Sequence, residues 1–297
     1  MAEKEQAEYT IHSEKEIPWK LCKKANRIVV KLGTRALIEE DLTFDDSLFE
    51  NLAIDLSELH AMGKEIIIVS SGAVNAGVKA LGLLKRPREL VSIQTMAAVG
   101  NPLLIEQYKN YFTFCNLGQV LLTQEDLSNR ESYNNFRNTM DDMLTRKIIP
   151  IINENDVVSV NEIRSRKDMQ LNFTDNDILA GLVAASMEAD LLIILSDIEG
   201  LYTKHPNSPY ADFVPYVPKI TEPVINMAQS GTELGKGGMY SKVLAGQITT
   251  YSGVTMIIAH AKKTRIKDLF KGTPKCTFFA PKEEYVRKNK EIWLMFG

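Results

Sequence analysis

The stretch Ile148-Ile149-Pro150-Ile151-Ile152-Asn153-Glu154-Asn155-Asp156 runs from an apolar segment directly into acids and amides. A second polar cluster, Phe173-Thr174-Asp175-Asn176-Asp177, comes just before a helix-like run over 178–187. Polar residues packed this densely beside apolar runs have little use in a core. Open α/β sheets bind ligands at the carboxyl ends of their strands, so we interpret the two loops as parts of one ligand site.

Apolar runs of strand length alternate with amphipathic, helix-like stretches along the chain. Strands are predicted at 27–32, 65–70, 119–122, 148–152, 191–195 and 254–258, and helices at 47–62, 132–145, 178–187 and 242–250. Continuous apolar strands separated by helices indicate a parallel sheet with both faces covered. We expect an α/β fold, a three-layer sandwich with a mainly parallel central sheet.

Two further segments carry weaker patterns. Residues 157–163 alternate apolar and polar side chains, which predicts a small hairpin over the site. Pro206, Pro209, Pro215 and Pro218 mark an irregular segment, which we interpret as a surface excursion. We expect a polar amino-terminal extension over 1–23 and a single domain over 24–297.

Composition excludes several classes of function. The chain has 297 residues, 44% of them hydrophobic and 25% charged, with a net charge of -3. The acidic balance argues against a nucleic-acid partner, and no apolar stretch approaches the roughly 20 residues of a membrane span. The polar residues 1–16 lack the apolar region of a signal peptide. Three scattered cysteines suggest a reducing compartment without structural zinc, so we expect a cytoplasmic protein without a membrane partner.

Lys31 interrupts the apolar run Val29-Val30-Lys31-Leu32-Gly33-Thr34. Burying an unpaired ammonium costs several kcal/mol, so a lysine inside a buried strand needs a partner. The alternative is an edge strand whose lysine reaches water. We favour a functional lysine, in a site that faces solvent because it lies at the strand ends.

Three segments of small or polar residues follow predicted strands or precede predicted helices. Ser70-Ser71-Gly72-Ala73 predicts a turn whose glycine lets the backbone approach a ligand, before a helix that favours anions at its start. The loop from Gly235 to Lys242 fails the Walker A spacing but offers glycines and lysines before a helix. Ser196 and Asp197 could hold a nucleotide or its metal. The alternative is an ordinary βα turn for residues 70–73, a flexible surface loop for residues 235–242, and a plain turn for Ser196 and Asp197.

Together these segments resemble the amino acid kinase family, and within it the enzymes that phosphorylate glutamate. The resemblance extends from about Lys24 to Thr273, nearly the whole chain. The segments that carry it are Val-Lys-Leu-Gly-Thr at 30–34, Ser-Ser-Gly-Ala at 70–73, Ala-Ala-Val-Gly at 97–100, Ile-Asn-Glu-Asn-Asp at 152–156, Thr-Asp-Asn-Asp at 174–177, Gly-Leu-Tyr-Thr at 200–203, and Gly-Gly-Met at 237–239 with Lys242.

The resemblance implies different roles for different residues. The half over 24–167 would bind the amino acid and the half over 168–297 the nucleotide. Glutamate would contact Ser71, Gly72, Asp156 and Asn176. The nucleotide would contact Lys31, Ser196, Asp197, Lys236, Gly237, Gly238, Met239, Tyr240, Ser241 and Lys242. Lys31, Lys242 and Asp177 would be catalytic, with Asp177 holding the two lysines in place.

The reaction implied is ATP + L-glutamate → ADP + L-glutamyl 5-phosphate, the first step of proline biosynthesis. Mg²⁺ would be held mainly through the ATP phosphates, and no residue is assigned to it. Proline as a feedback inhibitor and a homo-oligomer are further expectations. Many members continue into a carboxyl-terminal PUA-type domain, so the chain resembles a short form. Lys236 stands where a small polar residue is expected, which leaves its role open.

Two alternatives remain at this point. One is an enzyme of the same fold that acts on aspartate or acetylglutamate; an acetylated substrate has no ammonium for Asp156 to bind. The other is a non-catalytic amino-acid sensor, which would have no need of Lys31, Lys242 and Asp177 together.

Overall fold

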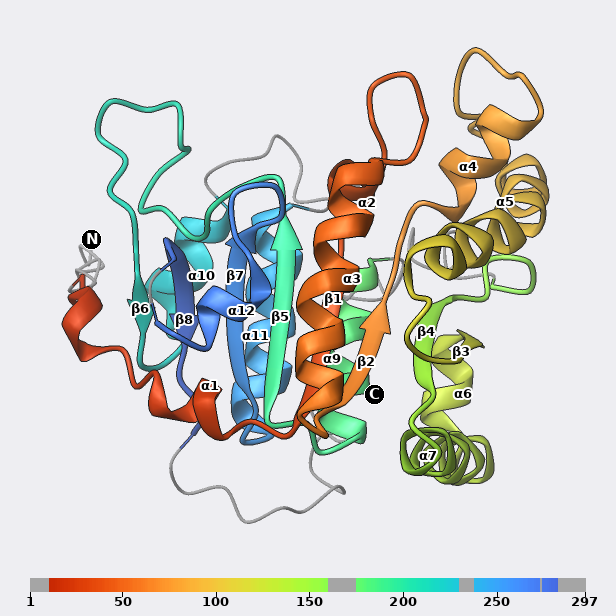
Figure 1. The fold of residues 1–297 in the computed structure, drawn as a ribbon. Coiled ribbons are helices and arrows are strands. Elements are labelled where there is room, and N and C mark those ends of the chain that lie inside the picture. Colours follow the sequence, from red (N-terminus) through yellow and green to blue (C-terminus); the bar gives the residue numbers. More distant parts are fainter. Residues whose placement is uncertain (1–10, 160–174, 230–237, 273, 283–297) are drawn as a thin grey trace.

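The centre of the molecule is an eight-stranded sheet with helices on both faces (Figure 1). The computed structural model describes residues 11–159, 175–229, 238–272 and 274–282. The strand order is β3-β4-β2-β1-β5-β7-β8-β6, and β8 runs antiparallel to β7. The strands are β1 (Arg27–Leu32), β2 (Glu65–Val69), β3 (Leu117–Leu122), β4 (Ile149–Glu154), β5 (Leu191–Ser196), β6 (Tyr216–Val217), β7 (Thr255–His260) and β8 (Cys276–Phe279).

The helices divide between two hydrophobic cores, one on each face of the sheet, which confirms the predicted three-layer sandwich. On one face lie α1 (Lys20–Lys24), α2 (Thr34–Leu37), α3 (Asp46–Ala61), α5 (Leu90–Tyr111) and α12 (Ile266–Leu269). On the other lie α6 (Gln124–Ser128), α7 (Arg130–Thr145), α9 (Asn176–Ser186), α10 (Glu222–Gln229) and α11 (Met239–Tyr251). Helix α4 (Ala73–Ala80) packs across α5, and a single 3-10 turn covers Glu14–Glu16.

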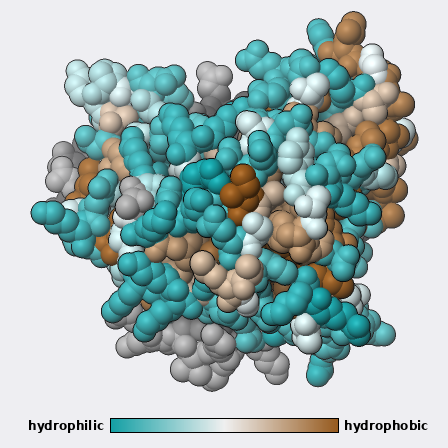
Figure 2. Space-filling view, viewed as in Figure 1, coloured by the Kyte–Doolittle hydropathy of each residue, from teal (hydrophilic) through white to brown (hydrophobic). Residues whose placement is uncertain are grey.

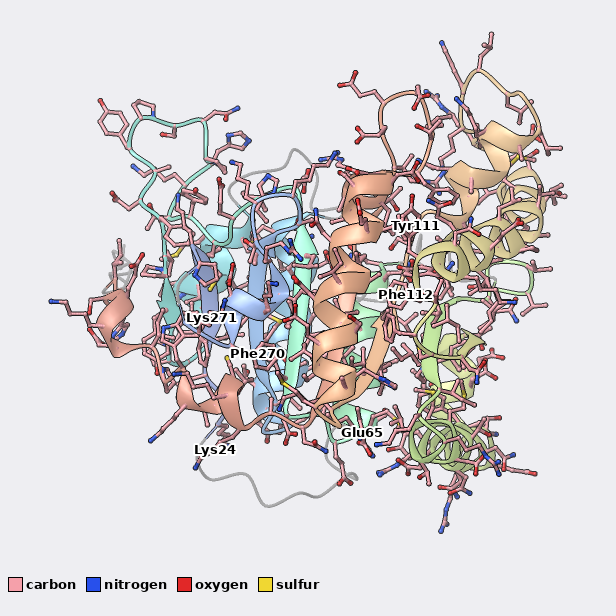
Figure 3. The ribbon with its side chains drawn as sticks, viewed as in Figure 1. Lys24, Glu65, Tyr111, Phe112, Phe270 and Lys271 are labelled. Carbon is pink, nitrogen blue, oxygen red and sulfur yellow. The ribbon has the colours of Figure 1, made fainter. Side chains whose placement is uncertain are left out.

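Alternation along the strands decides which core each side chain enters. In β1, Val29 belongs to the α9 and α11 core, and Val30 to the α3 and α5 core. Successive side chains point to opposite faces, so Lys31 shares the face of Val29 and points toward α9 and α11. The parallel strands β1, β2, β4 and β5 bring their carboxyl ends to one edge. Figure 3 labels Glu65 at the opposite, amino end of β2.

Most of the predicted elements are present, with shifted ends. The predicted strand over 27–32 coincides with β1, whereas β4 continues two residues further than predicted, to Glu154. The strands β6 and β8 were not predicted. The predicted hairpin over 157–163 falls mostly outside the described residues. The proline-rich segment is irregular and projects from the surface between β5 and β6, as predicted (Figure 1).

One part of the surface gathers apolar side chains. Leu81, Leu83, Leu84 and Val91 are exposed in and beside the connection between α4 and α5. Figure 2 shows apolar side chains at the upper right, where these two helices lie, on a face that is otherwise mainly hydrophilic. Within the described residues, no helix is both long enough and apolar enough to cross a membrane.

Candidate active site

Lys31 lies in the central strand β1, between β2 and β5, and is 4% exposed. Its Nζ is 2.5 Å from Oδ1 of Asp177. The alternative of an edge-strand lysine that reaches water is therefore wrong. The lysine has the partner that its burial requires.

Asp177 is the second residue of α9 and is 1% exposed. The preceding Asp175 caps the helix, because its Oδ1 accepts the backbone N–H of Asp177 at 2.9 Å. On the side of α11, Lys242 Nζ lies 2.8 Å from Asp177 Oδ2, and Ser241 Oγ donates to the same oxygen at 3.0 Å. One carboxylate thus holds two lysines that are 211 positions apart in the chain (242 − 31).

The charges of this cluster stabilise one another. Burial acts to raise the pKa of Asp177, but the charges of Lys31 and Lys242 outweigh it and hold that pKa below its usual value. Burial acts to lower the pKa of Lys242, yet the charge and hydrogen bond of Asp177 raise it above the usual value. Two ammonium groups that face one carboxylate give the site a surplus of positive charge, which suits a phosphate ligand.

The start of α11 supplies backbone and side-chain groups to the same cluster. Gly238 precedes the helix with φ of 84°, a left-handed conformation that favours glycine. Its carbonyl accepts from Ser241 Oγ at 3.0 Å and from Lys242 Nζ at 3.3 Å. Met239 and Tyr240 are half-buried in the first turn of α11. The predicted nucleotide residues Lys236 and Gly237 lie outside the described residues.

A cluster of amide side chains adjoins the charged cluster, because Asn176 directly precedes Asp177 in α9. Asn176 Nδ2 donates to Ser70 O at 3.0 Å, to Ser71 Oγ at 2.9 Å and to Asn153 Oδ1 at 3.1 Å. The loop that follows β2 and the carboxyl end of β4 therefore meet the start of α9, which brings Ser71 and Asn176 together. Oδ1 of Asn176 is buried and accepts no hydrogen bond from any of the described residues, so it is available to a donor on a ligand.

Gly72 and Asp156 lie in these same loops. Gly72 precedes α4 with φ of 97°, so a residue with a side chain would be strained there. The free N–H groups at the start of α4 form an anion-binding end beside Ser71. Asp156 is half-buried in the turn that follows β4.

Ser196 and Asp197 lie at the carboxyl end of β5. Ser196 Oγ donates to Asp197 Oδ1 at 3.0 Å, and Arg35 Nη1 donates to Asp197 Oδ2 at 3.2 Å. Burial acts to raise the pKa of Asp197, but these two donors hold it below the usual value. The charge of Asp197 in turn acts to raise the pKa of Lys242, which places Asp197 within electrostatic range of that lysine.

Two residues of the amide cluster were not predicted as site residues. Asn153 was quoted in its loop without a role, and Asn101 of α5 was not considered. Asn153 Nδ2 donates to Asn101 Oδ1 at 3.1 Å, and both residues are 4% exposed. The sequence feature that could have indicated Asn101 is an asparagine beside Gly100 in an apolar helix, because polar residues are seldom buried without a partner.

Comparison with known proteins agrees with this architecture. A model of the amino acid kinase family matches residues 26–260. Glutamate 5-kinase from Geobacter sp. (strain M21) is 41% identical over 281 residues, which are 93% of this chain and 73% of that protein. Glutamate 5-kinase 1 from Bacillus subtilis (strain 168) is 40% identical over 278 residues, which are 92% of this chain and 74% of that protein.

Solved structures share the fold at lower sequence identity. Carbamate kinase from Giardia lamblia bound to AMP-PNP has a TM-score of 0.58 and 16% identity, over 88% of this chain and all of that one. UMP kinase from Ureaplasma parvum has a TM-score of 0.55 and 17% identity, over 86% of this chain and 99% of that one. The match to the family model and the identity of about 40% to relatives over most of this chain lead to one conclusion: the chain belongs to the amino acid kinase family.

Proposed function

We propose that the chain transfers the γ-phosphoryl group of ATP to the γ-carboxylate of L-glutamate, giving ADP and L-glutamyl 5-phosphate. This is the first step of proline biosynthesis. The observation that carries the proposal is the buried cluster of Lys31, Asp177 and Lys242 directly beside the amide cluster of Asn176. Relatives about 40% identical over most of the chain bear the name glutamate 5-kinase.

The chemistry explains why two lysines are needed and a general base is not. The acceptor is a carboxylate with an ordinary pKa of about 4.3, so it is already ionised at neutral pH. The barrier is the repulsion between this anion and the phosphates, and phosphoryl transfer is catalysed mainly by alignment and charge stabilisation. Lys31 and Lys242 stabilise negative charge on the transferring group and on the leaving β-phosphate. Asp177 sets the position of both ammonium groups.

The donors and acceptors around Asn176 suit the amino acid. Ser71 and the N–H groups at the start of α4 offer donors to the γ-carboxylate of glutamate. Asp156 provides a negative charge for its α-ammonium. The buried Oδ1 of Asn176 is a further acceptor without a partner among the described residues. This set favours a free amino acid over a plain dicarboxylate.

The residues fit a magnesium ion that arrives with the nucleotide. The acid nearest to both lysines, Asp177, is already engaged by them. When bound with ATP, Mg²⁺ would neutralise phosphate charge. Gly238 and the first turn of α11 would contact the phosphates, with Ser196 and Asp197 at the adjacent strand end.

Three other properties are expected from the family and stay predictions. We expect proline to inhibit the enzyme and the chain to form a homo-oligomer in the cytoplasm. Light scattering of the purified chain and inhibition curves with proline measure the first two directly.

The acceptor is tested by measuring ADP release from MgATP with L-glutamate, L-aspartate and N-acetyl-L-glutamate. We expect kcat/KM to be highest with L-glutamate. A preference for either other acceptor would assign the chain to a different member of the family. ATP turnover that no amino acid stimulates, with tight binding of glutamate, would favour the sensor.

Asp156→Asn tests the contact to the ammonium while it preserves the shape of the side chain. A charge-assisted hydrogen bond is worth about 1.5–3 kcal/mol, so the KM for glutamate should rise roughly 10-fold or more. The KM for ATP should change little. Equal weakening of both substrates would show that Asp156 serves the nucleotide or the fold.

A further inference from the structure

Helix α5 is held unusually close to the start of α4, which directly follows the loop after β2. A Cβ atom added to Gly100 would lie 1.7 Å from the backbone oxygen of Ala73, so no side chain fits there. Further along α5, the hydroxyl of Tyr108 hydrogen-bonds to Ser70 Oγ at 2.9 Å. Beyond it, the ring of Tyr111, labelled in Figure 3, stacks on Phe49 of α3 at 6.0 Å. The helix therefore has a fixed position relative to Ser70 and Ser71.

Asn101 follows Gly100 and faces the amide cluster. A chain of hydrogen bonds runs from Ser70 O through Asn176 and Asn153 to Asn101. Ser70 O is a backbone carbonyl and can only accept, so the NH₂ end of Asn176 must face it. Asn176 then donates to Asn153 Oδ1, which turns the NH₂ end of Asn153 toward α5. Asn101 Oδ1 is the acceptor that completes the chain.

We propose that Asn101 is a positioning residue for the acceptor site. It touches neither substrate but fixes the orientation of Asn153, and through it that of Asn176. Loss of its oxygen leaves the NH₂ group of Asn153 unpaired in a buried place, which favours rotation of that amide. Asn176 then loses one of its three acceptors, so its amide is held only by Ser70 and Ser71 and its Oδ1 is positioned less firmly. The inference rests on the proposed function, because Asn176 is placed in the amino-acid site.

Asn101→Leu keeps a similar volume and removes the oxygen. Compared with the wild type, we expect the KM for the amino acid to rise about 10-fold. This corresponds to the free-energy cost of leaving one buried hydrogen-bonding group unpaired. The KM for ATP and kcat should change by less than about threefold, since Lys31, Asp177 and Lys242 keep their contacts. Asn101→Asp restores an oxygen acceptor at the same position, so its KM should return to near the wild-type value.

Leu104→Ala serves as the matched structural control. Leu104 is buried one turn further along α5 and belongs to the hydrophobic core, without a part in the amide chain. This variant should lower Tm and leave the KM for the amino acid near the wild-type value. A purely structural role for Asn101 would give the same pattern in Asn101→Leu, with a lower Tm and an unchanged KM, and that result would overturn the proposal.

An Asn101→Asp variant as impaired as Asn101→Leu would also overturn it. The comparison uses whichever acceptor the wild type phosphorylates best among glutamate, aspartate and acetylglutamate. A wild type that prefers another acceptor therefore refutes the proposed substrate, while the change in KM still decides the role of Asn101.

Discussion

At the scale of single residues, burial is the property in which the observed catalytic cluster differs most from the predicted one. The sequence led us to expect a site that faces solvent, and this expectation is wrong for Asp177, Lys31 and Lys242, whose exposed fractions are 1%, 4% and 8%. The lysines are therefore stabilised by one buried carboxylate and not by water. Removal of Asp177 leaves both buried lysines without their carboxylate, so activity and stability are coupled here.

Lys31→Ala and Lys242→Ala test the proposed stabilisation of the transition state. Each should lower kcat far more than it raises the KM for glutamate, because the contact strengthens as phosphate charge develops. By analogy with loss of an oxyanion-hole donor, the loss should be roughly 2.7–4 kcal/mol. Steady-state kinetics measure it, with Lys271→Ala as the control, since Lys271 is exposed and pairs with Asp268. A near-normal kcat in either lysine variant would remove that lysine from the mechanism.

Asp177→Ala is expected to affect folding as well as catalysis. The variant leaves two buried ammonium groups facing each other, and breaking a buried ion pair in this way costs roughly 3–5 kcal/mol. Urea unfolding should show this loss, together with a kcat as low as that of a lysine variant. Adding Lys242→Ala to this variant removes one of the two unpaired cations. The double variant should therefore lose less free energy of unfolding than the sum of the losses in the two single variants. Strict additivity would contradict a role for Asp177 as holder of both lysines.

At the scale of elements, the crossing of α4 and α5 positions the loop that follows β2. Gly77 and Gly100 allow the two backbones to approach, because a Cβ on either would lie within 2.0 Å of a backbone oxygen of the other helix. Pro102 stands inside α5 without ending it. This helix was not predicted from the sequence, since glycine and proline usually indicate helix ends and tertiary packing overrides them here.

Gly100→Ala should therefore damage the acceptor site through the backbone. The added methyl group collides with Ala73 O, so α5 must move away from the loop that carries Ser71 and Gly72. We expect a higher KM for glutamate together with a lower Tm. The matched variant Ala98→Gly should lower Tm modestly, because glycine inside a helix is less favourable than alanine by about 1 kcal/mol, and leave the KM unchanged. An unchanged KM in Gly100→Ala would show that the close crossing serves packing alone.

At the scale of the whole molecule, long-range charge pairs make stability depend on pH. Lys262 from the end of β7 reaches Asp45 before α3, and Lys263 reaches Glu199 after β5. Burial acts to raise the pKa of Asp45, but hydrogen bonds from Lys262 and Ser47 hold it at about 2. The hydrogen bond from Lys263 holds the pKa of Glu199 at about 2.

Because these pKa values are lower in the folded state, the unfolded chain binds more protons between about pH 5 and pH 2. The contribution of both carboxylates is complete above this range and is lost as the pH falls through it. Urea midpoints measured at pH 7, 5, 4 and 3 should fall with acidity. Asp45→Asn should have a lower midpoint at pH 7 and a flatter pH dependence. A variant curve parallel to that of the wild type would show that Asp45 does not contribute to the acid sensitivity.

The sequence predicted most of the sheet because strand patterns are local, whereas the charged cluster was expected from the resemblance to the family. The apolar run around Lys31 gives the limits of β1, while Asp177 and Lys242 stand in short motifs at the starts of α9 and α11. Asn101 could not be predicted in the same way, since 52 positions separate it from Asn153 and the fold alone brings them together. The antiparallel β8 has four residues, too few for a pattern that distinguishes its direction.

The central claim is that this chain phosphorylates the γ-carboxylate of free glutamate with the charges of Lys31 and Lys242. Hydroxylamine converts an acyl phosphate to a stable hydroxamate, whose position on glutamate is read by mass spectrometry against synthetic γ- and α-hydroxamates. With MgATP, L-glutamate and hydroxylamine, we predict steady formation of the γ-glutamyl hydroxamate by the wild type and almost none by Lys242→Ala. Formation of the α-hydroxamate, or equal rates in the wild type and Lys242→Ala, would contradict the account.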